Sequence, residues 1–280
     1  MQNRILCLNG AFLPTREGVV PVADRGFRFG DGLFETIFLQ AGTPYQWAFH
    51  LARLAQGLSA LRITPPVVDW AAIARELIAK NAISDGFLRI AISRGSGSKG
   101  YLPTGDSPTW VMEILDLADL PAAPARLWLS SLPRIPPACL PVNQKLAHGI
   151  NSTLAVLEAR DQGCDEALQL TLSGALCEAA SANLFWVSNG ALHTPALATG
   201  CLNGSTRAAI LRLAPVREVI ADITALKTAE AVFITNCRLG IWPVAHIQPL
   251  GLNFNASHQA IAPLQAALAA DRAVATWPAA

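Results

Sequence analysis

Two-residue turns between short apolar runs constrain the fold of this chain more than any other feature. Asn9-Gly10 divides the apolar stretch 5–13, and Ala41-Gly42 closes the alternating run 33–39. Ser173-Gly174 and Asn189-Gly190 mark two further hairpins. Turns of this kind join antiparallel strands directly, whereas parallel strands require a long crossover. The sequence therefore predicts hairpins of antiparallel strands in both halves of the chain.

Helical periodicity occurs in segments that are separate from the hairpins. The apolar residues of the first such segment follow a 4-3-4-3 spacing on one helical face: Trp47, Leu51, Leu54, Leu58 and Leu61. Asp69 can cap a second helix. Further helices are expected near residues 150–163, 206–213 and 257–270, and further strands at 87–93, 110–115 and 127–132. Because helices and hairpins are segregated, we predict an α+β fold and not a doubly wound α/β fold.

The length of 280 residues favours two domains. The segment 117–124 contains two prolines, which stiffen the chain and exclude a continuous helix. We therefore expect an N-terminal domain over 1–116, a linker over 117–124 and a C-terminal domain over 125–280.

Composition excludes several classes of function. A formal net charge of +1 without Lys/Arg runs argues against nucleic-acid binding. The apolar runs are too short for a signal peptide or a membrane span. The six cysteines form no Cys-x-x-Cys pair and the five histidines lack ligand spacing, so we expect reduced thiols and no metal. The prediction is a cytoplasmic protein whose partners are small molecules or a second copy of the chain.

Three polar features could carry chemistry, although each also has an ordinary structural interpretation. Lys145, one of only four lysines, follows a proline-rich segment and precedes a predicted helix; in an apolar place such a lysine becomes nucleophilic. Glu178 lies among small residues, where it either pairs with a buried cation or occupies a loop. The turn 203–207 offers backbone N–H groups to a phosphate, or is simply a helix cap.

The glycine-rich segment 94–101 does not fit a nucleotide-binding loop. No Ser or Thr follows Lys99, and no third glycine lies at the offset that a dinucleotide loop needs. A flexible substrate loop with Arg94 as an anion anchor fits the residues better.

Taken in order, these features resemble the class IV (fold type IV) pyridoxal-phosphate aminotransferase family over nearly the whole chain. The motifs that carry the resemblance are Asp24-Arg-Gly-Phe-Arg-Phe-Gly-Asp-Gly-Leu-Phe-Glu-Thr36, His50-x-x-Arg-Leu54, Lys145 with Asn151-Ser-Thr-Leu-Ala155 and Gly163-Cys-Asp-Glu-Ala167, Glu178 with Asn183-Leu-Phe185, Leu202-Asn-Gly-Ser-Thr-Arg207, and Thr235-Asn236 with Gly240-Ile-Trp-Pro-Val244. The resemblance implies a small N-terminal α/β sandwich domain, a larger β-barrel-like C-terminal α+β domain, and a homodimer.

The resemblance also implies residue roles. Lys145 would hold pyridoxal 5'-phosphate as a Schiff base and later transfer protons, and Glu178 would face the pyridine nitrogen and keep it protonated. Leu202 would pack on the ring. The remaining residues expected to bind the cofactor, mainly at its phosphate, are Arg53, Asn183, Gly204, Ser205, Thr206, Thr235 and Asn236.

Within the family, the segment 94–101, Phe34 and Thr235-Asn236 are most similar to the aminodeoxychorismate lyase branch. The implied substrate is an anion, for which the expected contacts are Arg28, Phe34, Arg94, Lys99 and Tyr101. An aminotransferase acting on D-amino or branched-chain acids would share every cofactor residue. A catalytically silent protein that only binds pyridoxal phosphate is a third, more remote hypothesis.

Overall fold

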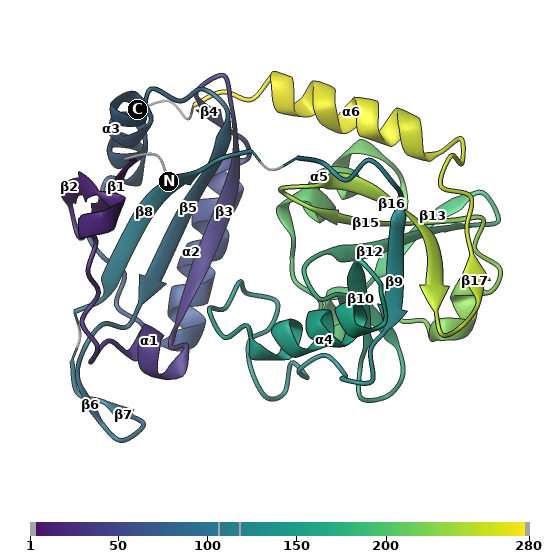
Figure 1. Cartoon of the computed structure of the whole chain (residues 1–280), viewed down its shortest axis with the longest axis horizontal. Coiled ribbons are helices and arrows are strands. Elements are labelled where there is room, and N and C mark those ends of the chain that lie inside the picture. Colours follow the sequence, from purple (N-terminus) through teal and green to yellow (C-terminus); the bar gives the residue numbers. More distant parts are fainter. Residues whose placement is uncertain (1–3, 106, 118, 278–280) are drawn as a thin grey trace. The chain divides into compact units, whose positions relative to one another are not determined.

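The computed structural model describes residues 4–105, 107–117 and 119–277 (Figure 1). The chain divides into two compact units. Unit 1 comprises Met1–Ala118, Gln144–His148 and Val274–Ala280, and unit 2 comprises Asp119–Asn143 and Gly149–Ala273. The change from unit 1 to unit 2 falls within the segment 117–124, of which Ala118 lies outside the described residues. The short piece that carries Lys145 belongs to unit 1, although the chain on both sides of it belongs to unit 2.

Unit 1 is built on a six-stranded antiparallel sheet in the order β2-β1-β8-β5-β3-β4. Its strands are β1 (Ile5–Leu8), β2 (Ala11–Pro14), β3 (Gly32–Gln40), β4 (Thr43–Pro44), β5 (Gly86–Ser93) and β8 (Thr109–Leu115). Both turn residues have positive φ at Asn9-Gly10 and again at Ala41-Gly42, as tight hairpins require. The two turns predicted for this half are confirmed.

Two helices of unit 1, α2 (Trp47–Leu61) and α3 (Trp70–Asn81), share one core with the sheet. The apolar face of α2 and the apolar residues of α3 pack against alternate residues of β3, β5 and β8. Asp69 caps α3 by accepting a hydrogen bond from the Ala72 N–H at 2.9 Å. Both predicted helices are confirmed. The remaining elements of the unit are the short helix α1 (Arg25–Phe29), a 3-10 turn (Thr15–Glu17) and the small ribbon of β6 (Ser98–Lys99) and β7 (Leu102–Pro103).

Unit 2 contains a nine-stranded mixed sheet, part of which closes on itself. Its strands are β9 (Ala125–Leu129), β10 (Glu166–Leu170), β11 (Leu176–Ala179), β12 (Asn183–Ser188), β13 (Ala191–Pro195), β14 (Val216–Val219), β15 (Ala231–Asn236), β16 (Gly240–Gln248) and β17 (Leu252–Asn253). Because β11 pairs with both β10 and β12, the strands β11-β10-β9-β16-β15-β12 form a ring. Apolar side chains such as Leu127, Leu184 and Val232 form its core. The predicted α+β fold with a barrel-like C-terminal sheet is confirmed.

The other elements of unit 2 are α4 (Ile150–Asp161), α5 (Ser205–Leu213), α6 (Ile261–Ala273) and two 3-10 turns (Leu197–Thr199 and Ile223–Leu226). Two predicted bounds were wrong. The strand expected over 127–132 ends at Leu129, because the Ser130 hydroxyl and the Ser131 N–H donate to Glu158 on α4 at 2.6 and 3.0 Å. The helix expected from residue 257 begins at Ile261, because Asn255 holds the preceding residues in a turn. No helix within the described ranges is long and apolar enough to cross a membrane.

Candidate functional site

Lys145 lies beside β3 in unit 1. The Phe34 N–H donates to the Lys145 carbonyl and the Ala147 N–H to the Gly32 carbonyl, both at 2.9 Å, and Leu33 and Leu146 form an isolated bridge. The segment therefore runs along the free part of the β3 edge as a short added strand. The half-buried Lys145 Nζ lies 4.5 Å from the centroid of the Phe34 ring. The lysine is fixed at both its backbone and its side chain.

Arg53 belongs to a buried cluster between α2 and β3. Its Nε and Nη2 atoms donate to the two oxygens of Glu35 at 2.8 and 2.6 Å, and His50, one turn earlier on α2, approaches Glu35 at 2.6 Å through Nδ1. Burial alone would raise the pKa of Glu35, but the hydrogen bonds from Arg53 and His50 outweigh it and hold the pKa at about 2. Burial lowers the pKa of His50. The cluster is thus an ionised Arg–Glu pair beside a neutral imidazole, with the guanidinium plane fixed.

Arg89 on β5 is a candidate that sequence reasoning missed. Its guanidinium carbon lies 5.0 Å from the centroid of the Phe34 ring, the same ring that Lys145 contacts. Its Nε is buried and has no hydrogen-bond partner within the described part of the chain. The alternation of the strand places Arg89 on the sheet face opposite Leu88 and Ile90, which lie in the core. In the sequence, the signal that could have identified Arg89 is a cation within an otherwise apolar strand.

Of the other residues expected to contact the substrate, Arg94 is bonded within unit 1, whereas three others are exposed. The Arg94 guanidinium donates to Asp31 at 2.8 and 3.1 Å and to the carbonyls of Leu61 and Arg62 at 2.7 Å each. Arg94 therefore ties its loop to unit 1 and is engaged internally. The side chains of Arg28, Lys99 and Tyr101 are exposed, so they keep their capacity to contact a ligand.

Unit 2 contains a row of buried polar residues that crosses four neighbouring strands. Gln169 on β10 is in register with Glu178 on β11, Glu178 with Asn183 on β12, and Asn183 with Thr235 on β15. Residues in register point to the same face of a sheet, so the row lies on the face opposite the apolar core that holds Leu168, Leu184 and Ile234. Three of the four were expected from the sequence; Gln169 was not.

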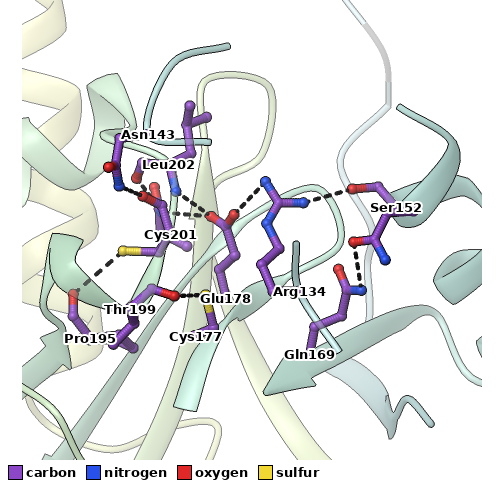
Figure 2. Close-up of polar contacts among 12 residues, drawn as sticks. Arg134, Asn143, Ser152, Gln169, Cys177, Glu178, Pro195, Thr199, Cys201 and Leu202 are labelled. Carbon is purple, nitrogen blue, oxygen red and sulfur yellow. Dashed lines mark hydrogen bonds and ion pairs between the residues drawn. The ribbon is translucent and has the colours of Figure 1, made fainter. Parts of the chain in front are cut away.

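The Glu178 carboxylate is held from two sides (Figure 2). Its Oε1 accepts from Arg134 Nη2 at 2.8 Å, and its Oε2 accepts from the Leu202 N–H at 3.0 Å and from Asn183 Nδ2 at 3.1 Å. Asn183 also donates to the Leu202 carbonyl at 2.8 Å. Leu202, expected as a contact of the cofactor ring, thus also helps to orient Glu178 through its backbone.

The expected phosphate-binding turn forms the start of α5. Gly204 precedes the helix in an extended conformation, and no side chain caps the helix among the described residues. The first turn therefore presents backbone N–H groups beside the buried Ser205 and Thr206. A Cβ atom on Gly204 would lie 2.1 Å from Asn183 Oδ1, so a larger residue at this position would have to displace the Asn183 side chain.

Thr235 and Asn236 differ in what their side chains can offer. The Thr235 hydroxyl is buried and has no partner among the described residues. The Asn236 amide instead donates to the Ser181 carbonyl at 3.1 Å, and its oxygen accepts from the N–H groups of Arg238 and Leu239. Thr235 can therefore bind a ligand, whereas Asn236 shapes the turn between β15 and β16.

Comparison with known proteins identifies the class to which this fold and these residues belong. The sequence model of the amino-transferase class IV family matches residues 32–247, so the chain belongs to this family. A putative branched-chain-amino-acid aminotransferase of Methanocaldococcus jannaschii is 31% identical over 88% of each chain. The aminodeoxychorismate lyase of Bacillus subtilis is 30% identical over 87% of each chain.

A solved structure is similar over nearly the whole chain. The branched-chain amino acid aminotransferase of T.th., complexed with N-(5'-phosphopyridoxyl)-L-glutamate, superposes with a TM-score of 0.88 at 26% identity. The match covers 98% of this chain and 95% of that one. No cluster of possible metal ligands occurs in the ranges that the structure describes.

Proposed function

We propose that the chain is a pyridoxal-phosphate-dependent aminodeoxychorismate lyase, which converts 4-amino-4-deoxychorismate into 4-aminobenzoate and pyruvate for folate biosynthesis. The observation that carries the cofactor assignment is the buried Glu178 carboxylate, held by three donors. The row to which Glu178 belongs ends at the Thr235 hydroxyl, which has no partner among the residues that the structure describes. Pyridoxal 5'-phosphate is the cofactor that family membership and the phosphopyridoxyl-bound neighbour indicate.

The donor set fits the chemistry of this cofactor. A phosphate needs N–H and O–H donors and positive charge, which the start of α5, Thr235 and Arg53 supply. A protonated ring nitrogen needs a carboxylate, which Glu178 supplies. We therefore propose Arg53, Ser205, Thr206 and Thr235 as phosphate contacts, Gly204 and Asn183 as the residues that shape this turn, and Lys145 as the covalent anchor.

When bound, pyridoxal phosphate delocalises the electron pair left on the amine-bearing carbon after that carbon loses its proton. Lys145 Nζ removes this proton in our proposal, and Glu178 keeps the ring nitrogen protonated throughout. The bond between the substrate ring and the oxygen of its enolpyruvyl group then breaks, with the electron pair leaving on oxygen, and the enolpyruvate takes up a proton to give pyruvate. Lys145 thus serves as anchor and as base.

The anionic substrate requires cations near Lys145. Arg89 and Lys145 contact the same Phe34 ring, and the buried Arg89 Nε is without a protein partner in the described residues. We propose Arg89 as a carboxylate contact in addition to Arg28 and Lys99. Arg94 would act indirectly, because its guanidinium fixes the loop that precedes Lys99.

An aminotransferase acting on D-amino or branched-chain acids is the second candidate, favoured by the relative from Methanocaldococcus jannaschii. The two reactions share the residues proposed above for the cofactor and differ after proton removal. In an aminotransferase, Lys145 would deliver the proton back so that the amino group is transferred, whereas in the lyase the enolpyruvyl group would be lost instead. The lyase relative from Bacillus subtilis and the similarity of segment 94–101 to the lyase branch support the lyase reaction.

The test supplies purified enzyme with 4-amino-4-deoxychorismate and measures 4-aminobenzoate and pyruvate. We expect both products in equal amounts, and a loss of about 10³-fold or more in kcat in Lys145→Ala, because the base and anchor are removed together. Absent products together with amino-group exchange between amino and keto acids would establish the aminotransferase. If neither activity occurs and borohydride-treated Lys145→Ala keeps cofactor absorbance after dialysis, the chain only binds the cofactor and Lys145 is not its anchor.

A further inference from the structure

The cation beside Glu178 comes from a segment that the sequence motifs leave without a role. Arg134 lies between β9 and α4, and its Nη2 pairs with Glu178 Oε1 at 2.8 Å, with only 15% and 5% of the two side chains exposed (Figure 2). The two residues are 44 positions apart, so neither local spacing nor composition points to the pair. Arg134 is the partner that a buried carboxylate at this position needs to remain charged.

Arg134 is itself anchored on both backbone and side chain. Its N–H donates to the Leu170 carbonyl at 2.8 Å, and its Nη1 donates to the Ser152 hydroxyl on α4 at 3.1 Å. The neighbouring Asn151 donates to the Pro133 carbonyl at 3.0 Å and accepts from Gln169 Nε2 at 3.1 Å. The Asn151-Ser152 motif therefore holds the segment of Arg134 against β10. Gln169 on this strand is in register with Glu178 on β11.

The thiols of Cys177 and Cys201, which adjoin Glu178 and its partner Leu202, contribute no charge near neutral pH. Burial raises the pKa of Cys177, which precedes Glu178 on β11, and raises the pKa of Cys201, which precedes Leu202, to about 11. Asn183 and the Leu202 N–H are neutral donors. Arg134 is the cation that forms the ion pair with Glu178, and it favours the ionised carboxylate over the protonated one.

We propose that Arg134 is a positioning residue that keeps Glu178 ionised and oriented toward the ring nitrogen of the cofactor. The inference rests on the proposed role of Glu178. The guanidinium fixes Oε1 while Leu202 and Asn183 fix Oε2, so the carboxylate cannot rotate. Without the cation, the buried carboxylate loses the charge that offsets its desolvation and takes up a proton more readily as the pH falls.

The experiment measures how well the apoenzyme distinguishes two ligands that differ only at the ring nitrogen. Dissociation constants for pyridoxal phosphate and for 1-deazapyridoxal 5'-phosphate, in which carbon replaces that nitrogen, are measured at pH 8 and pH 6. Both ligands share the phosphate and the aldehyde, so their ratio isolates the contact with Glu178. We expect the native chain to prefer pyridoxal phosphate by about tenfold to a hundredfold at both pH values, as a charged hydrogen bond implies.

In Arg134→Met, we expect the preference to fall about tenfold at pH 6 and less at pH 8, because protonation of Glu178 removes the charged contact. Affinity for the deaza compound should change by less than about twofold, which a general loss of structure would not allow. Arg134→Lys keeps the charge but cannot bridge Ser152 and Glu178 as a fork, so it should retain part of the preference. Arg126→Met is the matched control, since Arg126 pairs with the half-buried Asp165 near the surface of the same unit.

The outcomes separate this inference from the proposal on which it rests. If the native chain prefers pyridoxal phosphate and Glu178→Gln abolishes this preference, the role of Glu178 is supported. If the native chain shows no preference, the proposed roles of both Glu178 and Arg134 are overturned. A native preference that survives unchanged in Arg134→Met at both pH values overturns the inference alone. If Arg134→Met does not fold by circular dichroism, Arg134→Lys and Ser152→Ala decide the question, and full preference in both contradicts the proposal.

Discussion

Glu35 and Glu178 are both buried carboxylates, and their partners give them different tasks. Glu35 is enclosed by Arg53 and His50, which hold both of its oxygens. Its charge serves to fix the guanidinium that we propose as a phosphate contact. Glu178 is held by Arg134 and by neutral donors, in a row of ligand-competent groups. The first carboxylate orients a neighbouring residue, whereas the second is proposed to contact the cofactor itself.

Replacing Glu35 with Gln should lower the free energy of unfolding by about 3–5 kcal/mol at pH 7, because Arg53 loses its buried counter-charge. The pKa of Glu35 is depressed from 4.5 to about 2 in the folded chain, so its contribution is complete above pH 4.5 and is lost as the pH falls toward 2. Urea unfolding of both chains should therefore show a difference that shrinks below pH 4.5. A difference that is constant from pH 7 to pH 3 would contradict the assignment of an ionised Glu35.

At the scale of elements, the start of α5 depends on a glycine for space and not for backbone freedom. Gly204 has φ −71° and ψ 144°, which alanine also adopts, but its added Cβ would overlap Asn183 Oδ1. Gly204→Ala should therefore displace Asn183, weaken cofactor binding and destabilise the chain by about 1–3 kcal/mol. Isothermal titration and urea unfolding measure the two effects.

The double variant Gly204→Ala/Asn183→Ala is the matched control, because it removes the overlapping side chain. It should be more stable than the sum of the two single changes predicts. Additive effects would show that position 204 acts independently of Asn183.

Elements with local signals were predicted well from the sequence. Turn residues with positive φ located the hairpins, and helical spacing with a capping aspartate located α2 and α3. The errors lie where distant residues intervene. Glu158 on α4 accepts from Ser130 and Ser131 and thereby ends β9 early. Such side-chain contacts across 27 or 28 positions leave no periodic trace in the sequence.

Contacts between distant residues also escaped prediction at the candidate site. The motifs indicated Lys145, Arg53 and Glu178 because each stands in a recognisable run of residues. Arg134 and Arg89 were missed because their importance arises only from pairing: Arg134 with Glu178, and Arg89 with the ring that Lys145 contacts. Strand pairing brings Arg89 near Phe34, and hydrogen bonds from a loop to β10 and α4 bring Arg134 to Glu178; both depend on contacts between distant residues.

At the scale of the whole molecule, the large apolar residues at helical spacing on α4 do not lie in the core. Ile150, Leu154 and Leu157 follow helical spacing but are 55%, 47% and 53% exposed, while Ala155 and Ala159 form the buried face. An exposed apolar stripe on a chain with 52% hydrophobic and 15% charged residues favours association. We predict that this stripe takes part in the contact between two copies of the chain in the homodimer that the family resemblance implies.

Placing charge on this stripe should therefore separate the two copies. Leu154→Lys combined with Leu157→Lys should convert a dimer into a monomer in size-exclusion chromatography with light scattering, with circular dichroism unchanged, because two charges would have to be buried. Val67→Lys is the control, since Val67 is fully exposed in the segment between α2 and α3 and its replacement should leave the dimer intact. A native chain that is monomeric at every concentration contradicts the homodimer. A dimer that survives both lysines places the contact elsewhere on the surface.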